Sequence, residues 1–271
     1  MKVIVSHDVD HLYARDHWLR DLYFPKLWFR ETKNLIRRQI TFGEWIKRCL
    51  SCFSWKLNNI PEVLAFDREN GVPSTFFFGM NQGMSMSYKP DEAAAMIEYV
   101  NRNGFSAGVH GIAYNEEGMI RQERSAFQKV AGKPAAGIRM HYVRNDENTL
   151  ALLEKAGYSY DSSVFDKQKG YTIQAPYRQG TIWEFPVGLM DSYLGLDLGK
   201  MKSATLEYMK MAEKSGIRYF TVLFHDVYYR DTYKAYKAWY EWLITYIGQN
   251  AGYSFISFDD AVRELSMEEK R

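Results

Sequence analysis

Two carboxylates and two imidazoles lie at the end of the first predicted strand. The apolar residues 3–5, of sequence VIV, are followed by SHDVDH at residues 6–11. Because side chains alternate between the two faces of a strand, Asp8 and Asp10 point the same way. Neighbouring carboxylates repel each other, so such a pair usually implies a cation between them or a shared proton. The alternative is a turn after an edge strand, where Asp and His are common.

Four of the six histidines share this placement. His7, His110, His141 and His225 follow or end predicted strands. The carboxyl ends of the strands in parallel α/β folds meet on one face, where the sites of these folds lie. A single histidine in such a position is more often a structural hydrogen-bonding group than a ligand. As a set, however, these histidines predict a site shared with four more residues: Asp8, Asp10, Arg139 and Asp161.

The elements that would position these side chains alternate between strands and helices. Strands are predicted within 2–11 and at 74–78, 105–109, 136–140, 158–161, 182–185, 219–224 and 254–257. Helices are predicted at 61–70, 90–101, 119–131, 147–156, 201–215 and 233–249. This order favours an α/β fold with a parallel sheet, either a (β/α) barrel or an open doubly wound sheet. No glycine-rich phosphate loop follows the first strand, which weakens the nucleotide-binding version.

Residues 12–59 interrupt the alternation and are predicted to be a helical insertion in a single domain spanning residues 1–271. Residues 11–60 hold ten Lys and Arg against four Asp and Glu, and also four of the seven Trp. Apolar spacing predicts short amphipathic helices at 34–40 and 45–50. Aromatic rings stack on sugar faces and cations suit phosphate, so we expect the segment to form a wall or lid for a glycan precursor. A solvated helical face, a dimer interface and a membrane-surface patch are the alternatives.

The N-terminal sequence and the lengths of the apolar stretches indicate where in the cell the protein is located. The N-terminus lacks a basic region followed by the roughly 7–15 apolar residues of a signal peptide. No stretch approaches the roughly 18 apolar residues that a membrane span needs. We therefore expect a cytoplasmic protein without a transmembrane segment.

Five segments, taken in order, resemble the motifs of the NodB-homology polysaccharide deacetylases. This carbohydrate esterase family consists of metal-dependent hydrolases, and the likeness covers most of the chain outside 12–60. The segments are Asp8-Val9-Asp10, His110-Gly111-Ile112-Ala113-Tyr114, Arg139-Met140-His141-Tyr142, Asp161-Ser162-Ser163-Val164-Phe165-Asp166 and Leu223-Phe224-His225. Tyr114 stands where the family has a second histidine, and His141 replaces a proline. The chain most resembles a subgroup with S-H-D-V-D and R-x-H-Y signatures, which is associated with bacterial surface polysaccharides such as O-antigen.

The resemblance implies a distorted (β/α) barrel of about seven parallel strands that holds a divalent metal ion, zinc being the first choice. Asp10 and His110 would be metal ligands. Three protein ligands are usual for catalytic zinc. The third ligand is left open among four residues: Tyr114, His141, His7 and His11.

The resemblance also implies the catalytic groups. Asp8 would be the general base, oriented by Arg139 through a bidentate ion pair. The backbone N–H of Tyr142 would face the oxyanion. His225, kept protonated by Asp161, would deliver a proton to the leaving amine.

We favour a hydrolase that removes an N-acetyl or related acyl group from an amino sugar or glycan precursor in bacterial surface-polysaccharide biosynthesis. Hydrolysis of another non-peptide C–N bond, or carbohydrate binding with a degenerate metal site, are the alternatives. The presence of Asp8, Arg139, Asp161 and His225 together argues against lost catalysis, because a binding protein needs neither an acid nor a base. Nucleic-acid binding has only the basic aromatic segment in its favour, and we expect none. The oligomeric state is open, a homo-oligomer included.

Overall fold

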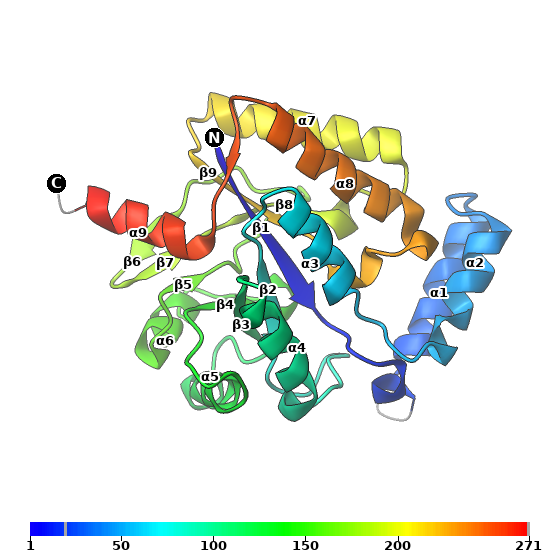
Figure 1. The fold of residues 1–271 in the computed structure, drawn as a ribbon, viewed down its shortest axis with the longest axis horizontal. Coiled ribbons are helices and arrows are strands. Elements are labelled where there is room, and N and C mark those ends of the chain that lie inside the picture. The colour runs from blue at the N-terminus through cyan, green and yellow to red at the C-terminus, as the bar shows by residue number, and fades with distance from the viewer. Residues whose placement is uncertain (19–20, 270–271) are drawn as a thin grey trace.

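One curled sheet forms the centre of the computed structural model, which describes residues 1–18 and 21–269 (Figure 1). Its strand order is β6-β7-β5-β4-β3-β2-β1-β9-β8, and β10 pairs with β1. The strands are β1 (Lys2–Val9), β2 (Thr75–Gly79), β3 (Ser106–Gly111), β4 (Gly137–Met140), β5 (Tyr160–Asp161), β6 (Tyr177–Gln179), β7 (Ile182–Glu184), β8 (Val187–Met190), β9 (Tyr219–Leu223) and β10 (Ser254–Phe255). All pair in parallel except β6 with β7. The predicted distorted (β/α) barrel is confirmed as a half-barrel surrounded by helices.

Nine α-helices are found in the described residues. They are α1 (Tyr23–Ile36), α2 (Phe42–Cys49), α3 (Ile60–Glu69), α4 (Pro90–Arg102), α5 (Glu117–Ala131), α6 (Thr149–Ala156), α7 (Leu198–Lys214), α8 (Lys234–Gln249) and α9 (Phe258–Glu268). Helices α3 to α8 surround the curled sheet, whereas α1 and α2 stand at one edge of the molecule, beside the carboxyl end of β1 (Figure 1). None of the described helices has the length and apolar character that crossing a bilayer requires.

Two strands and two helices differ from the sequence predictions. The antiparallel strand β6 and the four-residue strand β8 were not predicted. The predicted helix at 34–40 is wrong, because α1 ends at Ile36 and Arg38 takes a left-handed φ of 55°. Helix α9 was also not predicted. Its Phe258 packs against Ile4 of β1 and Phe77 of β2, and so covers the inner face of the curl away from the polar strand ends.

The parallel register brings the polar strand ends together. Asp8 of β1 is level with Phe77 of β2, and His110 of β3 is level with Arg139 of β4. Along β1, even-numbered side chains lie on the inner face, as alternation requires. Asp8 therefore lies inside the curl, in the same layer as the Arg139 guanidinium, whose central carbon is 4.7 Å from the centre of the Phe77 ring.

On the outer face of β1, His7 belongs to a buried polar cluster. Asp67 of α3 accepts hydrogen bonds from Ser74 Oγ at 2.5 Å and Tyr240 OH at 2.5 Å, and its Oδ2 lies 2.9 Å from His7 Nε2. All four side chains are buried. Since buried donors without an acceptor are costly, this carboxylate ties α3 to β1 and α8.

We predict that Asp67→Ala lowers the free energy of unfolding by about 3 kcal/mol or more, because it leaves three buried polar partners without their acceptor. Urea unfolding followed by circular dichroism measures the loss. Glu69→Ala, an exposed site on the same helix, should change stability by no more than about 0.5 kcal/mol. Equal losses in the two variants would contradict the role given to Asp67.

Candidate metal and catalytic site

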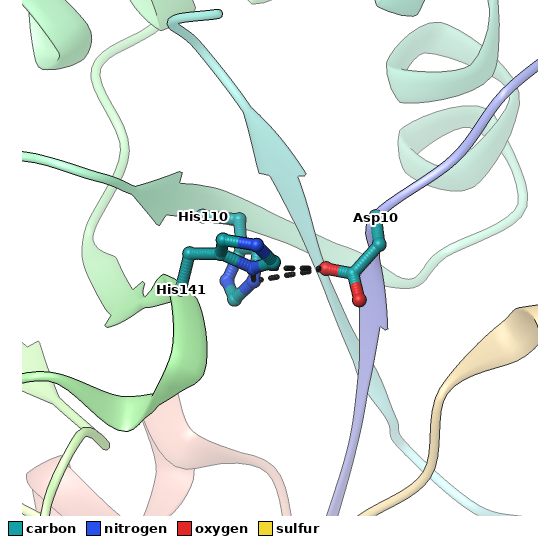
Figure 2. A group of neighbouring side chains, drawn as sticks. All are labelled: Asp10, His110 and His141. Atoms are coloured by element: carbon teal, nitrogen blue, oxygen red, sulfur yellow. Dashed lines mark hydrogen bonds and ion pairs between the residues drawn. The ribbon is translucent and has the colours of Figure 1, made fainter. Parts of the chain in front are cut away.

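Three potential metal ligands meet at the carboxyl ends of β1, β3 and β4. Asp10 follows β1, His110 lies in β3 and His141 follows β4. Asp10 Oδ1 is 3.2 Å from both His110 Nε2 and His141 Nδ1, and the two ring nitrogens are 3.0 Å apart (Figure 2). These atoms come from strands far apart in the sequence, and the sheet register brings them to one point.

Backbone carbonyl groups determine which nitrogen of each imidazole carries a proton. His110 Nδ1 lies 3.0 Å from the carbonyl oxygen of Arg139, and His141 Nε2 lies 3.1 Å from that of Met84. A carbonyl oxygen can only accept, so both of these nitrogens are N–H donors. In the neutral rings, His110 Nε2 and His141 Nδ1 are then acceptors without a proton, and their lone pairs face each other.

The donor set fits a divalent metal ion. Asp10 Oδ1 is buried and has no hydrogen-bond partner of acceptable geometry among the described residues, although it faces the two bare nitrogens. Three acceptor atoms therefore lie close together with no donor between them, and a cation bound among them would satisfy all three. Two imidazoles and one carboxylate are a ligand set found in catalytic zinc sites, and the ligand atoms here lie within 4.8 Å of one another.

The other three candidates for the third ligand do not join this group. The Arg144 guanidinium lies over the Tyr114 ring, with its central carbon 4.9 Å from the centre of that ring. Tyr114 does not line the pocket. His7 faces the opposite side of β1. His11 borders the pocket, but its ring packs on His17 and Tyr23. Of the four candidates, His141 is the one that joins Asp10 and His110 in the possible ligand group.

Asp8 lies beside the three ligands and is held by Arg139. Arg139 Nη1 donates to Asp8 Oδ1 at 3.1 Å and to Ser6 Oγ at 2.8 Å. Its Nε and Nη2 donate to the carbonyl oxygen and the hydroxyl of Ser162 at 2.8 and 2.7 Å. The expected contact between Asp8 and Arg139 is present, but the expected bidentate geometry is wrong, because the guanidinium is shared among three partners. Asp8 Oδ2 is 3.7 Å from His110 Nε2 and free of the arginine.

His225 is oriented by Asp191, which the sequence analysis did not single out. Asp191 Oδ1 lies 2.8 Å from His225 Nδ1, and its Oδ2 accepts the backbone N–H of His225 at 2.6 Å. His225 Nε2 then points into the pocket, 3.8 Å from Asp10 Oδ2. Burial alone would lower the pKa of His225, but Asp191, with help from Asp10 and Asp8, raises it to about 10. The ring is therefore protonated at neutral pH.

The prediction that Asp161 keeps His225 protonated is wrong. Asp161 is buried next to Glu184 on the neighbouring strand β7, and Ser163 Oγ donates to it at 2.6 Å. The same hydroxyl accepts the N–H of Met140 at 2.8 Å. Burial, the charge of Asp161 and their mutual hydrogen bond raise the pKa of Glu184 well above its usual range. Glu184 therefore holds the proton of this pair, and Asp161 supports the backbone at the end of β4.

Tyr142 borders the pocket in a strained backbone conformation. Its φ of 58° and ψ of 23° are left-handed, and the next residue, the β-branched Val143, has a φ of 44°. Such conformations cost roughly 1–3 kcal/mol each and are found mainly at functional sites. The strain turns the chain sharply after His141, which leaves the phenol ring half exposed at the pocket mouth.

The potential metal ligands, Asp8, His225 and Tyr142 line one cavity of about 430 Å³. Asp8, Asp10, His110, His141 and His225 line its floor. Its walls come from several segments of the chain. They include Tyr23, Lys26, Leu27 and Arg30 of α1, Ser85 after β2, Tyr142 and Val143 after β4, Lys167 after β5, Ser192 and Tyr193 after β8, and Val227 and Tyr228 after β9. The predicted insertion at 12–59 thus supplies one wall of the candidate site.

A comparison of the sequence with protein-family models and with curated proteins finds no match.

Solved structures share the fold. A Mycobacterium smegmatis protein assigned as a polysaccharide deacetylase is 17% identical, with a TM-score of 0.65 over 99% of this chain and 91% of that one. Puue Allantoinase is 12% identical, with a TM-score of 0.59 over 97% and 88% of the two chains. A Pseudomonas aeruginosa PAO1 protein described as a probable polysaccharide deacetylase is 14% identical, with a TM-score of 0.59 over 97% and 89%. This chain therefore shares its half-barrel fold with polysaccharide deacetylases. At such low sequence identities the similarity is one of fold.

We predict that His141→Ala weakens zinc binding more than tenfold, because removal of one coordinating imidazole costs at least the roughly 1.4 kcal/mol that a tenfold change in affinity represents. Tyr114→His should leave the affinity unchanged, since position 114 does not face the ligand atoms. Isothermal titration of both variants and the unaltered protein with zinc measures this. Tighter binding by Tyr114→His together with unchanged binding by His141→Ala would identify position 114 as the ligand position instead.

Proposed function

We propose that the protein is a metal-dependent amide hydrolase that removes an acetyl or related acyl group from an amino sugar or its glycan. The observation that carries the proposal is the convergence of two imidazole nitrogens and a carboxylate oxygen beside a second carboxylate, Asp8, and a protonated imidazole, His225, all lining one cavity. Deacetylation needs this combination of a metal site, a base and an acid. The shared fold with polysaccharide deacetylases supports the choice of acyl transfer from an amino sugar to water.

Asp10, His110 and His141 would hold the ion, which supplies Lewis acidity to an amide carbonyl and lowers the pKa of water. Asp8 is the base: its Oδ2 accepts the proton of the attacking water while Arg139 holds Oδ1. The backbone N–H of Tyr142 would donate to the oxygen of the tetrahedral intermediate. His225 then gives its Nε2 proton to the nitrogen as the C–N bond breaks. The products are a carboxylate and a free amine.

The roles of Asp161 and Asp191 differ in this proposal. Asp191 orients His225 and stabilises its protonated form, so it is a positioning residue for the general acid. Asp161 acts through Ser163 on the backbone that precedes His141 and Tyr142. It is a positioning residue for the metal ligand and the oxyanion donor.

The proposal also includes the identity of the metal, the origin of the substrate and the place of activity. Zinc is the first choice of metal because imidazole and carboxylate ligands suit it. The S-H-D-V-D and R-x-H-Y signatures favour a substrate from bacterial surface-polysaccharide biosynthesis, with cytoplasmic activity on a precursor.

Hydrolysis of another non-peptide C–N bond is the second candidate, and the shared fold with Puue Allantoinase favours it. The same acid, base and metal ligands would serve a cyclic amide. Assays of the zinc-loaded protein with allantoin and with N-acetylglucosamine oligomers distinguish the two candidates. Turnover of allantoin alone would replace the first proposal by the second.

We predict that Asp8→Asn lowers kcat about 10²–10⁴-fold, the usual contribution of a general base, and leaves zinc content unchanged. Acetate release and elemental analysis provide the two readouts. Asp146→Asn, outside the pocket lining, is the matched control and should retain activity. Turnover within twofold of the unaltered protein would remove Asp8 from the mechanism.

We predict that Asp191→Asn lowers kcat by about 10²–10⁴-fold, as loss of the general acid would, with KM little changed. It should also abolish the downfield proton resonance of His225 Nδ1–H, because the carboxylate acceptor is gone. Asp161→Asn should keep that resonance. The opposite pattern in proton NMR spectra would restore Asp161 as the partner of His225.

A further inference from the structure

The mouth of the active-site cavity is positively charged. Its lining includes Lys26 and Arg30 of α1 and Lys167 of the segment after β5. The carboxylates among the lining residues are Asp8 and Asp10. Arg139 already neutralises Asp8, and Asp10 belongs to the metal site. No lining carboxylate is therefore left to balance the three cations at the mouth.

Arg30 is held in position by a buried carboxylate. Its Nε donates to Glu31 Oε1 at 2.9 Å, and the other Glu31 oxygen accepts from Arg48 Nη1 at 2.8 Å. Glu31 and Arg48 are 1% and 2% exposed, whereas Arg30 is 49% exposed. One carboxylate between two guanidinium groups leaves one positive charge in excess. The Nε contact also leaves both Nη groups of Arg30 to face a ligand.

Lys26 adds a second cation one helical turn before Arg30. Residues four apart lie on the same face of a helix, and both side chains border the cavity. Four tyrosines also line it: Tyr23, Tyr142, Tyr193 and Tyr228. Aromatic faces of this kind can pack on a sugar ring, while a guanidinium fork and an ammonium group match an anionic oxygen cluster.

We propose that Lys26 and Arg30 form a subsite for an anionic substituent of the substrate. The acylated amino sugar would then carry a phosphate, a diphosphate or a carboxylate away from the scissile amide. The inference rests on the proposed function for the identity of the sugar, but the anion subsite itself is a property of α1.

The kinetic test compares N-acetylglucosamine 1-phosphate and N-acetylmuramic acid with neutral N-acetylglucosamine. The double variant Lys26→Met/Arg30→Gln should raise KM for the anionic sugar at least tenfold, with kcat and the neutral substrate little affected. Lys33→Met, on the same helix but outside the cavity lining, should behave like the unaltered protein. Preference for the phosphate or for the carboxylate identifies the anion. Equal KM values for charged and neutral sugars would overturn the subsite but not the hydrolase.

A binding test separates failure of the subsite from failure of the function. Metal-free protein is titrated with N-acetylglucosamine 1-phosphate, so that phosphate cannot bind to a metal ion. The unaltered protein should bind at least tenfold more tightly than the double variant. Binding without turnover of any acylated sugar would keep the subsite and refute the hydrolase. Equal binding by the two proteins would refute the subsite.

Apolar side chains are exposed on the outer side of α1, and they support a second inference. Leu22, Phe29 and Ile36 are 64%, 75% and 76% exposed. Their seven-residue spacing puts them on one face of α1. Exposed apolar side chains continue beyond α1 with Phe42, Leu50, Phe53 and Trp55.

Basic residues flank this apolar face. Lys33 of α1 and Arg37, directly after it, are exposed. Of the two acidic residues between positions 22 and 56, Glu31 is buried and Glu44 is partly exposed. A second copy of so basic a surface would be repelled by it. An amphipathic helix with exposed aromatic and basic side chains instead suits the interface of an anionic bilayer.

We infer that this face of α1 docks on an anionic lipid surface, with the cavity mouth beside it. Vesicles of phosphatidylcholine with phosphatidylglycerol should sediment the protein, and vesicles of phosphatidylcholine alone should do so at least tenfold less. Phe29→Ser/Ile36→Ser should lose the binding, while Leu206→Ser, an exposed site on α7, should retain it. Absence of vesicle binding, with self-association of the unaltered protein that the double variant abolishes in analytical ultracentrifugation, would make the face a dimer interface.

Discussion

Two backbone carbonyl groups, those of Arg139 and Met84, determine the chemistry of the candidate site. By accepting the outer N–H groups of His110 and His141, they leave the inner nitrogens without protons. Asp10 Oδ1, His110 Nε2 and His141 Nδ1 lie within 3.2 Å of one another. When both rings are neutral, none of these three atoms carries a proton to donate in a hydrogen bond. The arrangement is stable only if a cation or an extra proton fills it. The left-handed turn at Met84 (φ 54°) therefore supports the site from a loop distant from it in sequence.

The rest of the fold positions groups around these three atoms. The parallel register puts Asp8 and the Arg139 guanidinium in one layer on the inner face, behind the ligands. Strands β8 and β9 are neighbours, so Asp191 at the end of one reaches His225 at the end of the other. Asp8 and His225, the proposed base and acid, thus come from the neighbouring strands β1 and β9. Helix α1 adds a wall that carries two of the three cationic residues of the mouth, Lys26 and Arg30.

Local patterns in the sequence were enough to predict much of this arrangement. Alternation within β1 put Asp8 and Asp10 on one face. The strand–helix order predicted a parallel sheet, either a barrel or an open doubly wound sheet, and the resemblance to the deacetylase family implied the distorted barrel. The partner of His225 was not predictable in the same way, because it depends on which strands are neighbours. Asp161 stands at the end of β5, which pairs with β4 and β7, whereas β9 lies between β1 and β8. Strand β8 was missed because Pro186 precedes it and Gly188 interrupts its apolar residues, and both residue types are unfavourable within strands.

The sequence left the third ligand open among four residues and gave no sign of the covering helix, for different physical reasons. After His141 the chain turns through left-handed conformations at Tyr142 and Val143, which those residue types do not favour, so the path of the chain at His141 was not predictable. Helix α9 follows the short strand β10 directly, and its few buried residues, Phe258 and Ala261, give a weak periodic signal. Tertiary contacts determine both features.

Anomalous diffraction at the zinc absorption edge, on crystals of the zinc-loaded protein, would locate the ion. We expect one strong peak at about 2.0–2.2 Å from Asp10 Oδ1, His110 Nε2 and His141 Nδ1. A peak bound through Tyr114, or the absence of any peak between these three side chains, would contradict this expectation.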